Sequence, residues 1–144
     1  MPLTEEHRFG MQLANLSRGW RAELDRRLAD LGLSQARWLV LLHLARFSEP
    51  PTQRELAKSV GVEGPTLARL LDSLENHGLV QRQAVLEDRR AKKILLSDTA
   101  RPLIEKIETI ATDLRHELFA GLDEEDLRVC LRVHSTILGN LEKS

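Results

Sequence analysis

The chain has 144 residues, and its 21 basic and 22 acidic side chains give a formal net charge of −1 at pH 7. This length is enough for one domain, and the balance of charge excludes a polycation, so any binding of nucleic acid must depend on local clusters of basic residues. The single cysteine, Cys130, excludes an intramolecular disulfide and a cysteine-rich metal site. We expect a cytoplasmic protein without a membrane span, a signal peptide or a metal cofactor, because the sequence has no long apolar run and no paired histidine motif.

The first predicted element is a long amphipathic helix over about residues 6–31. Its apolar side chains recur every three or four residues, which is the spacing of one helix face: Leu13, Leu16, Trp20, Leu24, Leu28 and Leu31. Gly32 ends this helix, and Ser34 can cap the next one. The second helix is expected to bury one face, and Pro50 stops it. The residues of that face are Trp38, Leu41, Leu42 and Ala45.

Residues 52–78 predict two short helices around a tight turn. Thr52 and Glu55 have the spacing of a capping box, in which each side chain accepts a hydrogen bond from the other residue's backbone N–H. Gly61 is suited to the positive φ at which the first helix ends. Three residues then mark the ends of the second helix, which are Gly64 as its N-cap, Pro65 at its first position and Gly78 after its last turn.

The second of these helices has an apolar face and a polar face. Its inward side is predicted to hold leucines at helical spacing: Leu67, Leu70, Leu71 and Leu74. The opposite side holds short polar side chains and one arginine: Thr66, Arg69, Asp72, Ser73 and Asn76. Such a face fits the major groove of DNA, where Thr66 and Ser73 allow close approach and Arg69 can pair with guanine or phosphate. The alternative is an ordinary solvated face of a helix-turn-helix that does not bind DNA.

Two short runs after this helix, residues 79–85 and 91–96, predict a β-hairpin whose loop is residues 86–90. The loop and the second strand concentrate positive charge in four residues: Arg89, Arg90, Lys92 and Lys93. An arginine at the tip of a hairpin can enter the narrow, negative minor groove, and the lysines beside it can bind phosphates. Asp88 is expected to brace one of these arginines through a charge-assisted hydrogen bond.

Two more amphipathic helices are predicted after the hairpin. The first is expected to have Thr99 as its N-cap, which places Pro102 at the third helical position, where no backbone donor is needed. The last helix follows Asp123 as its N-cap, and Cys130 is interpreted as a small core residue of this helix. With the first helix, these elements carry more apolar surface than the central unit can cover, so we expect a homodimer. The alternative is that the three helices cover one another within a monomer.

One stretch of the chain carries a family resemblance. Asp88-Arg89-Arg90, in a hairpin after Leu74-Glu75-Asn76-His77-Gly78-Leu79-Val80, resembles the winged helix-turn-helix of the MarR family of bacterial transcription regulators. The longer match, which includes Ser17-Arg18-Gly19-Trp20-Arg21 and Arg89-Arg90-Ala91-Lys92-Lys93, is most similar to its SlyA/RovA-like branch. The resemblance covers nearly the whole chain.

This resemblance implies one mainly α domain, residues 1–144, with a small β-hairpin wing. Residues 34–97 would form the winged helix-turn-helix, and residues 1–33 and 98–144 would be interlocking dimerisation helices. Arg69 on the recognition helix and Arg89 and Arg90 at the wing would contact DNA.

The resemblance also implies an effector site. Related proteins bind aromatic carboxylates such as salicylate in the crevice between the dimer helices and the DNA-binding part. The matching residues would be Arg18, Arg21 and Trp38, because a guanidinium can pair with a carboxylate while a ring packs on the indole. The alternative is that Trp38 fills the core and both arginines form salt bridges.

The sequence contains no phosphate-binding loop and no recognisable catalytic motif, which argues against an enzyme. We interpret the chain as a sequence-specific regulator that binds duplex DNA as a homodimer on a palindromic operator. The rival interpretation is a helical dimer whose winged unit binds a polypeptide. Salt dependence would separate the two, because DNA binding loses affinity steeply as salt rises.

Overall fold

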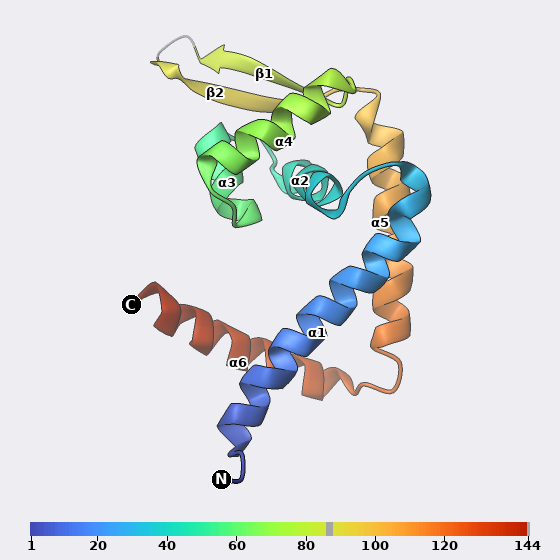
Figure 1. The fold of residues 1–144 in the computed structure, drawn as a ribbon, viewed down its shortest axis with the longest axis vertical. Helices are drawn as coiled ribbons and strands as arrows, with labels where there is room; N and C mark the ends of the chain where they lie inside the picture. The colour runs from blue at the N-terminus through green and yellow to red at the C-terminus, as the bar shows by residue number, and fades with distance from the viewer. Residues whose placement is uncertain (86–87, 144) are drawn as a thin grey trace. The chain divides into compact units, whose positions relative to one another are not determined.

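The structure is a computed structural model, and it describes residues 1–85 and 88–143, except for the side chains of residues 88–90. Its elements, in chain order, are α1 (Glu5–Leu28), the short 3₁₀ helix η1 (Ala29–Leu31), α2 (Gln35–Arg46), α3 (Gln53–Val60), α4 (Gly64–Asn76), β1 (Val80–Val85), β2 (Asp88–Leu96), α5 (Ala100–Leu118) and α6 (Glu124–Glu142) (Figure 1). The chain divides into two compact units, residues 1–112 and 113–144. The predicted fold class, mainly α with a β-hairpin wing, is confirmed.

Helix α2 lies at the centre of the larger unit. It contacts α3, α4 and β2, so it buries side chains in more than one direction (Figure 1). Its buried residues are Trp38, Val40, Leu41, Leu42 and Leu44. The predicted face was wrong in part, because it contained Ala45, which is exposed, and omitted Val40 and Leu44. A helix with neighbours on several sides does not need a single apolar stripe.

The core around α2 is built from α3, α4 and the hairpin. Its buried side chains come from four elements: Leu56 and Ala57 of α3, Leu67, Leu71 and Leu74 of α4, Val80 of β1 and Ile94 of β2. Leu70, which was predicted to face inward, is only partly buried. The three fully buried leucines of α4 fix which side of that helix remains free.

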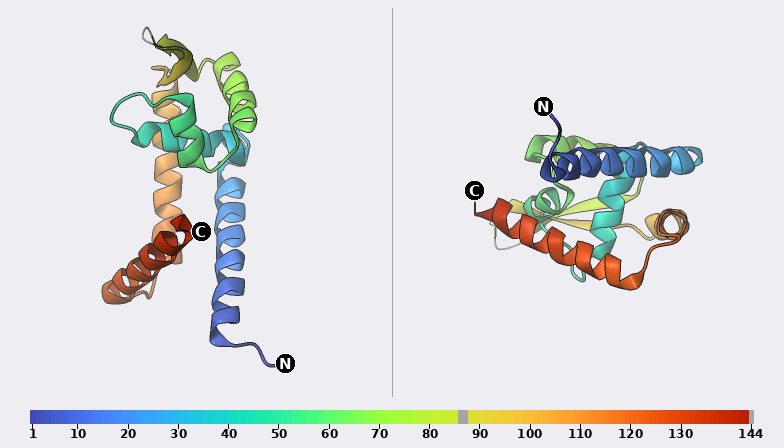
Figure 2. Two further views of the ribbon diagram at one scale, coloured as in Figure 1. Left: turned by 90° about the vertical axis from the view of Figure 1, so that its left-hand side faces the viewer. Right: turned by 90° about the horizontal axis from the view of Figure 1, so that it is seen from below.

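Helix α1 is buried only near its C-terminal end, at Leu24 and Leu28. Its N-terminal half extends away from α2, α3 and α4 (Figure 2). Four large apolar side chains of that half are exposed in the single chain: Phe9, Met11, Leu13 and Leu16. The end of the predicted helix is instead the 3₁₀ turn, which Gly32 closes with a φ of 74°. Ser34 takes the N-cap position of α2, but its side chain makes no capping hydrogen bond.

The hairpin pairs β1 with β2 in antiparallel register, with Val80 opposite Leu96 and Arg82 opposite Ile94. The predicted loop of residues 86–90 was too long, because β2 already begins at Asp88. Leu86 and Glu87, the rest of that loop, lie outside the described residues. A feature that the sequence did not predict is a bridge between Thr52 and Lys93, where the Ile94 N–H also donates to the Pro51 carbonyl at 2.9 Å. The segment before α3 therefore pairs with β2 on its other edge.

Helix α5 begins at Ala100, so Pro102 occupies the third helical position as predicted. Thr99 precedes the helix, and its hydroxyl donates to the Gly78 carbonyl at 2.7 Å. The Asp123 carboxylate accepts from the Glu125 N–H at 3.4 Å at the start of α6, which confirms the predicted cap. No helix among the described residues is long and apolar enough to span a membrane.

Helix α6 buries none of its residues in the single chain. Its exposed apolar side chains are Val129, Leu131, Val133, Ile137, Leu138 and Leu141. Cys130 is exposed as well, so its interpretation as a core residue is wrong for the single chain. The apolar spacing that predicted a core position is the spacing of a face that this chain does not cover.

Candidate nucleic-acid interface

The helix-turn-helix is formed by α3 and α4. At its start, the Thr52 N–H donates to Glu55 Oε1 at 3.2 Å and the Glu55 N–H donates to Thr52 Oγ1 at 3.1 Å, which confirms the predicted capping box. The backbone hydrogen bond lowers the pKa of the Glu55 carboxyl, and the Thr52 hydroxyl and the charge of Lys93 add to this shift. Gly61 ends α3 with a φ of 84°, in the left-handed region where a glycine avoids steric cost.

Helix α4 starts one residue earlier than predicted. Glu63 takes the N-cap position and Gly64 is the first helical residue, so the predicted positions of Gly64 and Pro65 are each off by one. Proline still fits, because the first helical positions need no backbone donor. Gly78 follows the helix with a φ of 73°, as the sequence predicted. These two ends leave a short helix whose leucine side packs inward.

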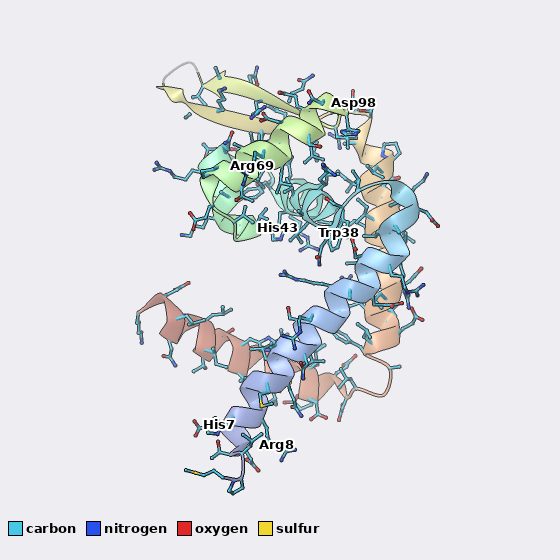
Figure 3. All side chains as sticks on the ribbon, in the orientation of Figure 1. His7, Arg8, Trp38, His43, Arg69 and Asp98 are labelled. Carbon is cyan, nitrogen blue, oxygen red and sulfur yellow. The ribbon has the colours of Figure 1, made fainter. Side chains whose placement is uncertain are left out.

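The predicted contact face of α4 is on its open side. Arg69 is exposed, and Thr66 and Ser73 are partly buried beside it. Figure 3 places Arg69 on α4, away from Trp38 and His43 of α2. No ion pair connects Arg69 to any of the side chains that the structure describes. Its guanidinium is therefore available to an external acceptor.

The hairpin contributes exposed cations next to this face. Lys92 and Lys93 are exposed on β2, opposite Ala84 and Gln83 of β1. Because successive residues of a strand point to opposite faces, the two lysines do not share one side of the hairpin. The backbone of Asp88, Arg89 and Arg90 belongs to β2, while their side chains lie outside the described part of the chain.

The hairpin is attached to the recognition helix by an arginine that the sequence analysis missed. Arg82 of β1 donates through Nη2 to Asp72 Oδ1 and, at 3.1 Å, to Glu75 Oε1, and both carboxylates belong to α4. The Arg82 N–H also donates to Glu75 Oε2 at 3.1 Å. These hydrogen bonds lower the pKa of Glu75, and they raise that of Arg82. Asp72, predicted on the open face of α4, is thus already paired. Sequence spacing gives no signal for a pair ten residues apart on different elements.

Two further exposed cations lie on α3 and were also missed. Arg54 and Lys58 are four residues apart, so they share one side of this helix. Leu56 and Ala57 occupy its buried side. The spacing of these two residues could have indicated them, because basic residues four apart on a short amphipathic helix lie together on its polar side. With them, positive charge lies on both helices and on the hairpin.

The tentative effector residues do not gather in one place. Arg21 lines a half-open hollow of about 190 Å³ together with Gln35, Ala36, Leu39, Val60, Val62 and Leu70. Trp38 is only 2% exposed, is not in this lining, and donates from Nε1 to Asp25 Oδ1 at 3.4 Å. Arg18 is exposed and donates to the Asn15 side chain within α1. Of the three, Arg21 alone meets the hollow.

His43 connects α2 to α3 close to this region. Its Nδ1 lies 2.8 Å from Ser59 Oγ. Burial lowers the pKa of His43, and the positive charges of Arg46 and Arg21 lower it further. The imidazole is therefore favoured in its neutral form between the two helices.

Comparison with known proteins gives the same architecture. Residues 31–91 match the sequence model of the MarR family. The transcriptional regulator PA3341 is 63% identical, with a TM-score of 0.89 over 94% of this chain and 99% of that one. The chain belongs to the MarR family of transcriptional regulators. Its family is one of regulators and not of enzymes.

More distant structures share the fold. The MepR–DNA complex of S. aureus is 25% identical, with a TM-score of 0.81 over 96% of this chain and 99% of that one. AbsC from Streptomyces coelicolor, another MarR family regulator, shares the fold with a TM-score of 0.87 at 20% identity over 100% of this chain and 99% of that one. The family match covers α2, α3, α4, β1 and the first residues of β2, so it contains Arg69 but ends before Lys92 and Lys93.

Proposed function

We propose that this MarR-family protein is a sequence-specific regulator of transcription that binds duplex DNA as a homodimer on a palindromic operator. The observation that carries the proposal is the open face of α4, where an exposed Arg69 has no ion-pair partner among the described side chains and lies beside a cationic hairpin. A helix of this kind inserts into the major groove, and a hairpin beside it reaches the adjacent minor groove. The solved complex of MepR with DNA, at 25% identity, supports DNA as the partner.

Each predicted residue would have its own role in binding DNA. Arg69 would pair with a base edge, and Thr66 and Ser73 would allow α4 to approach. The wing would supply two arginines to the minor groove and two lysines to phosphates: Arg89, Arg90, Lys92 and Lys93. Asp88 would brace one wing arginine. Arg54 and Lys58 of α3 would add phosphate contacts on the other side of the recognition helix.

A homodimer accounts for the apolar side chains left exposed on α1 and α6. Residues 1–33 and 98–144 would be the dimerisation helices around the winged part, residues 34–97. A second copy would also give the protein two recognition helices. If they are spaced about one turn of DNA, ~34–36 Å, they read two half-sites in successive major grooves. This geometry predicts a palindrome as the preferred site.

The test is selection of bound sequences from a random duplex library by the full-length protein. A palindromic site whose affinity falls steeply with salt supports the proposal, because the release of counterions from phosphates dominates such binding. Arg69→Ala and Arg90→Ala should weaken binding to the selected duplex, whereas Lys106→Ala on α5 should not. No enriched site, or a weak response to salt, would favour the rival function, a helical dimer that binds a polypeptide.

We further propose that the chain belongs to the SlyA/RovA-like branch and that a small aromatic carboxylate tunes its DNA binding. The branch is supported by the sequence at residues 17–21 and 89–93. The effector is supported by the hollow beside Arg21, whose other lining side chains are mostly apolar and whose size of about 190 Å³ suits a single ring better than a larger ligand. Calorimetry with salicylate tests it. Heat that disappears in Arg21→Gln, together with a change in affinity for the selected duplex, is the expected result, since an effector must distinguish two states. Binding that leaves DNA affinity unchanged would contradict it.

A further inference from the structure

Arg82 occupies an unusual position for a basic residue of a DNA-binding hairpin. It lies opposite Ile94 in the hairpin register, on the side of β1 that also carries the buried Val80. Its side chain is only 17% exposed, whereas the two carboxylates that it contacts, Asp72 and Glu75, are 60% and 41% exposed. The guanidinium is thus directed toward α4 and away from solvent.

The contacts of Arg82 join two elements that would both touch DNA. One guanidinium nitrogen bonds to Asp72 and Glu75, and the backbone N–H of the same residue bonds to the second oxygen of Glu75. A two-point attachment of this kind restricts both sliding and rotation of β1 against α4. It sets the distance and the angle between the hairpin and the recognition helix, which must match the distance between neighbouring grooves.

The same contacts also solve an electrostatic problem. Asp72 follows Arg69 by three residues, so a carboxylate lies on the open side of the recognition helix next to the residue expected to contact DNA. Two unpaired carboxylates there would repel phosphates. Arg82 offsets one of the two negative charges and holds both carboxylates by hydrogen bonds, and because the two carboxylates themselves are exposed, these ion pairs contribute little to folding stability. Their benefit would therefore be seen in DNA binding.

We propose that Arg82 is a positioning residue for DNA recognition, which fixes the hairpin against α4 and offsets the charge of Asp72 and Glu75 without contacting DNA itself. This inference rests on the proposed function, because it concerns how the same surface binds duplex DNA. It differs from the obvious expectation for an arginine of the wing, which is a direct phosphate contact.

The test measures Arg82→Gln in two backgrounds, with the duplex selected by the wild-type protein and fluorescence anisotropy as the readout. In the wild-type background we expect a loss of affinity of about tenfold, since the substitution removes the positive charge that offsets two carboxylates beside the phosphates. In the background Asp72→Asn/Glu75→Gln we expect Arg82→Gln to change affinity by less than about twofold. A direct phosphate contact predicts a similar loss in both backgrounds, and that result would overturn the proposal.

A matched control is available on α6, where Arg128 is also held by two carboxylates, Glu124 and Glu125. Arg128→Gln removes the same charge without touching the hairpin and should leave DNA affinity unchanged. Thermal unfolding of each variant shows whether it is folded, and Arg82→Lys, which keeps the charge but not the planar guanidinium, should bind with intermediate affinity. If the wild-type protein selects no duplex, the proposed function fails and this role fails with it. If it selects one but the two backgrounds give equal losses, only the role of Arg82 fails.

Discussion

The winged part of the chain and its terminal helices differ in how completely a single copy buries them. In the winged part, Leu41, Leu56, Leu67, Leu71 and Ile94 are each fully buried. In α6 no residue is buried, and the N-terminal half of α1 leaves large apolar side chains in solvent. One copy therefore completes the core of the winged part by itself, whereas α6 and the N-terminal half of α1 carry apolar surface that this copy does not cover.

The largest effect is expected when a charge is placed on the apolar face of α6. Leu138 is 60% exposed in the single chain, so Leu138→Glu should be harmless to a monomer. In a homodimer it would bury a carboxylate once per copy, and we expect the dissociation constant of the dimer to rise by at least about a hundredfold. Sedimentation velocity over a range of concentrations measures this. Arg132→Glu, on the polar side of α6, is the control, and equal sedimentation of both variants would exclude the apolar face as the interface.

The complementary change is in the core of the winged part. Leu71→Ala should destabilise the protein by about 2–5 kcal/mol, because it removes a fully buried side chain of α4 and leaves a cavity. The loss should be the same at low and high protein concentration, unlike that of Leu138→Glu. Urea unfolding at several concentrations provides the measurement. A small loss would mean that the leucine side of α4 is not the one that packs on α2.

A third prediction concerns the surface of the winged part and not its core. Arg90→Ala should weaken DNA binding by about 1–3 kcal/mol while the unfolding midpoint stays near that of the wild type, because the substitution removes one charge of the wing. Anisotropy with the selected duplex and a thermal melt give the two values. Wild-type affinity in this variant would remove the wing tip from the proposed interface.

Much of the winged part could be predicted from the sequence, because the patterns that indicate its helices are local. The capping box at Thr52 and Glu55, the glycine at residue 61 and the leucine spacing of α4 each depend on residues within one turn or one helix. The ends of α4 and β2 were displaced by one to three residues, since helix caps and hairpin loops tolerate several alternatives.

What the sequence could not give depends on contacts between distant residues. The attachment of Arg82 to Asp72 and Glu75 and the pairing of Pro51 with Ile94 join residues that only the folded chain brings together. The same reason explains Cys130 and Ala45, because periodicity shows that a face is apolar but not what covers it. The hollow beside Arg21 likewise combines residues from α1, α2 and the helix-turn-helix.

A smaller effect is expected in the pH dependence of stability, because of the partly buried His43 in the winged part. The folded-state pKa of His43 lies below its ordinary value of 6.5, mainly through burial, so the folded protein favours the neutral imidazole. Its contribution to stability is therefore present above pH 6.5 and is lost as the pH falls through the lowered folded-state pKa. His43→Gln should flatten this part of the curve of unfolding free energy against pH. Ser59→Ala should not, because burial and not the hydroxyl is the main cause of the shift.

The smallest effect is expected near the C-terminal end of α1, where this helix leads into the winged part. Hydrogen bonds from Arg26 and then Arg27 lower the pKa of Glu23 from 4.5 to about 2. This lowered value means that the carboxylate adds stability above pH 4.5, which is lost as the pH falls toward 2. Glu23→Gln should lower the melting temperature slightly at neutral pH, and the difference from the wild type should shrink in acid. Because both partners belong to the same helix, the variant should alter neither the sedimentation of the dimer nor its affinity for DNA, and a change in either would mean that this turn of α1 contributes to the assembly.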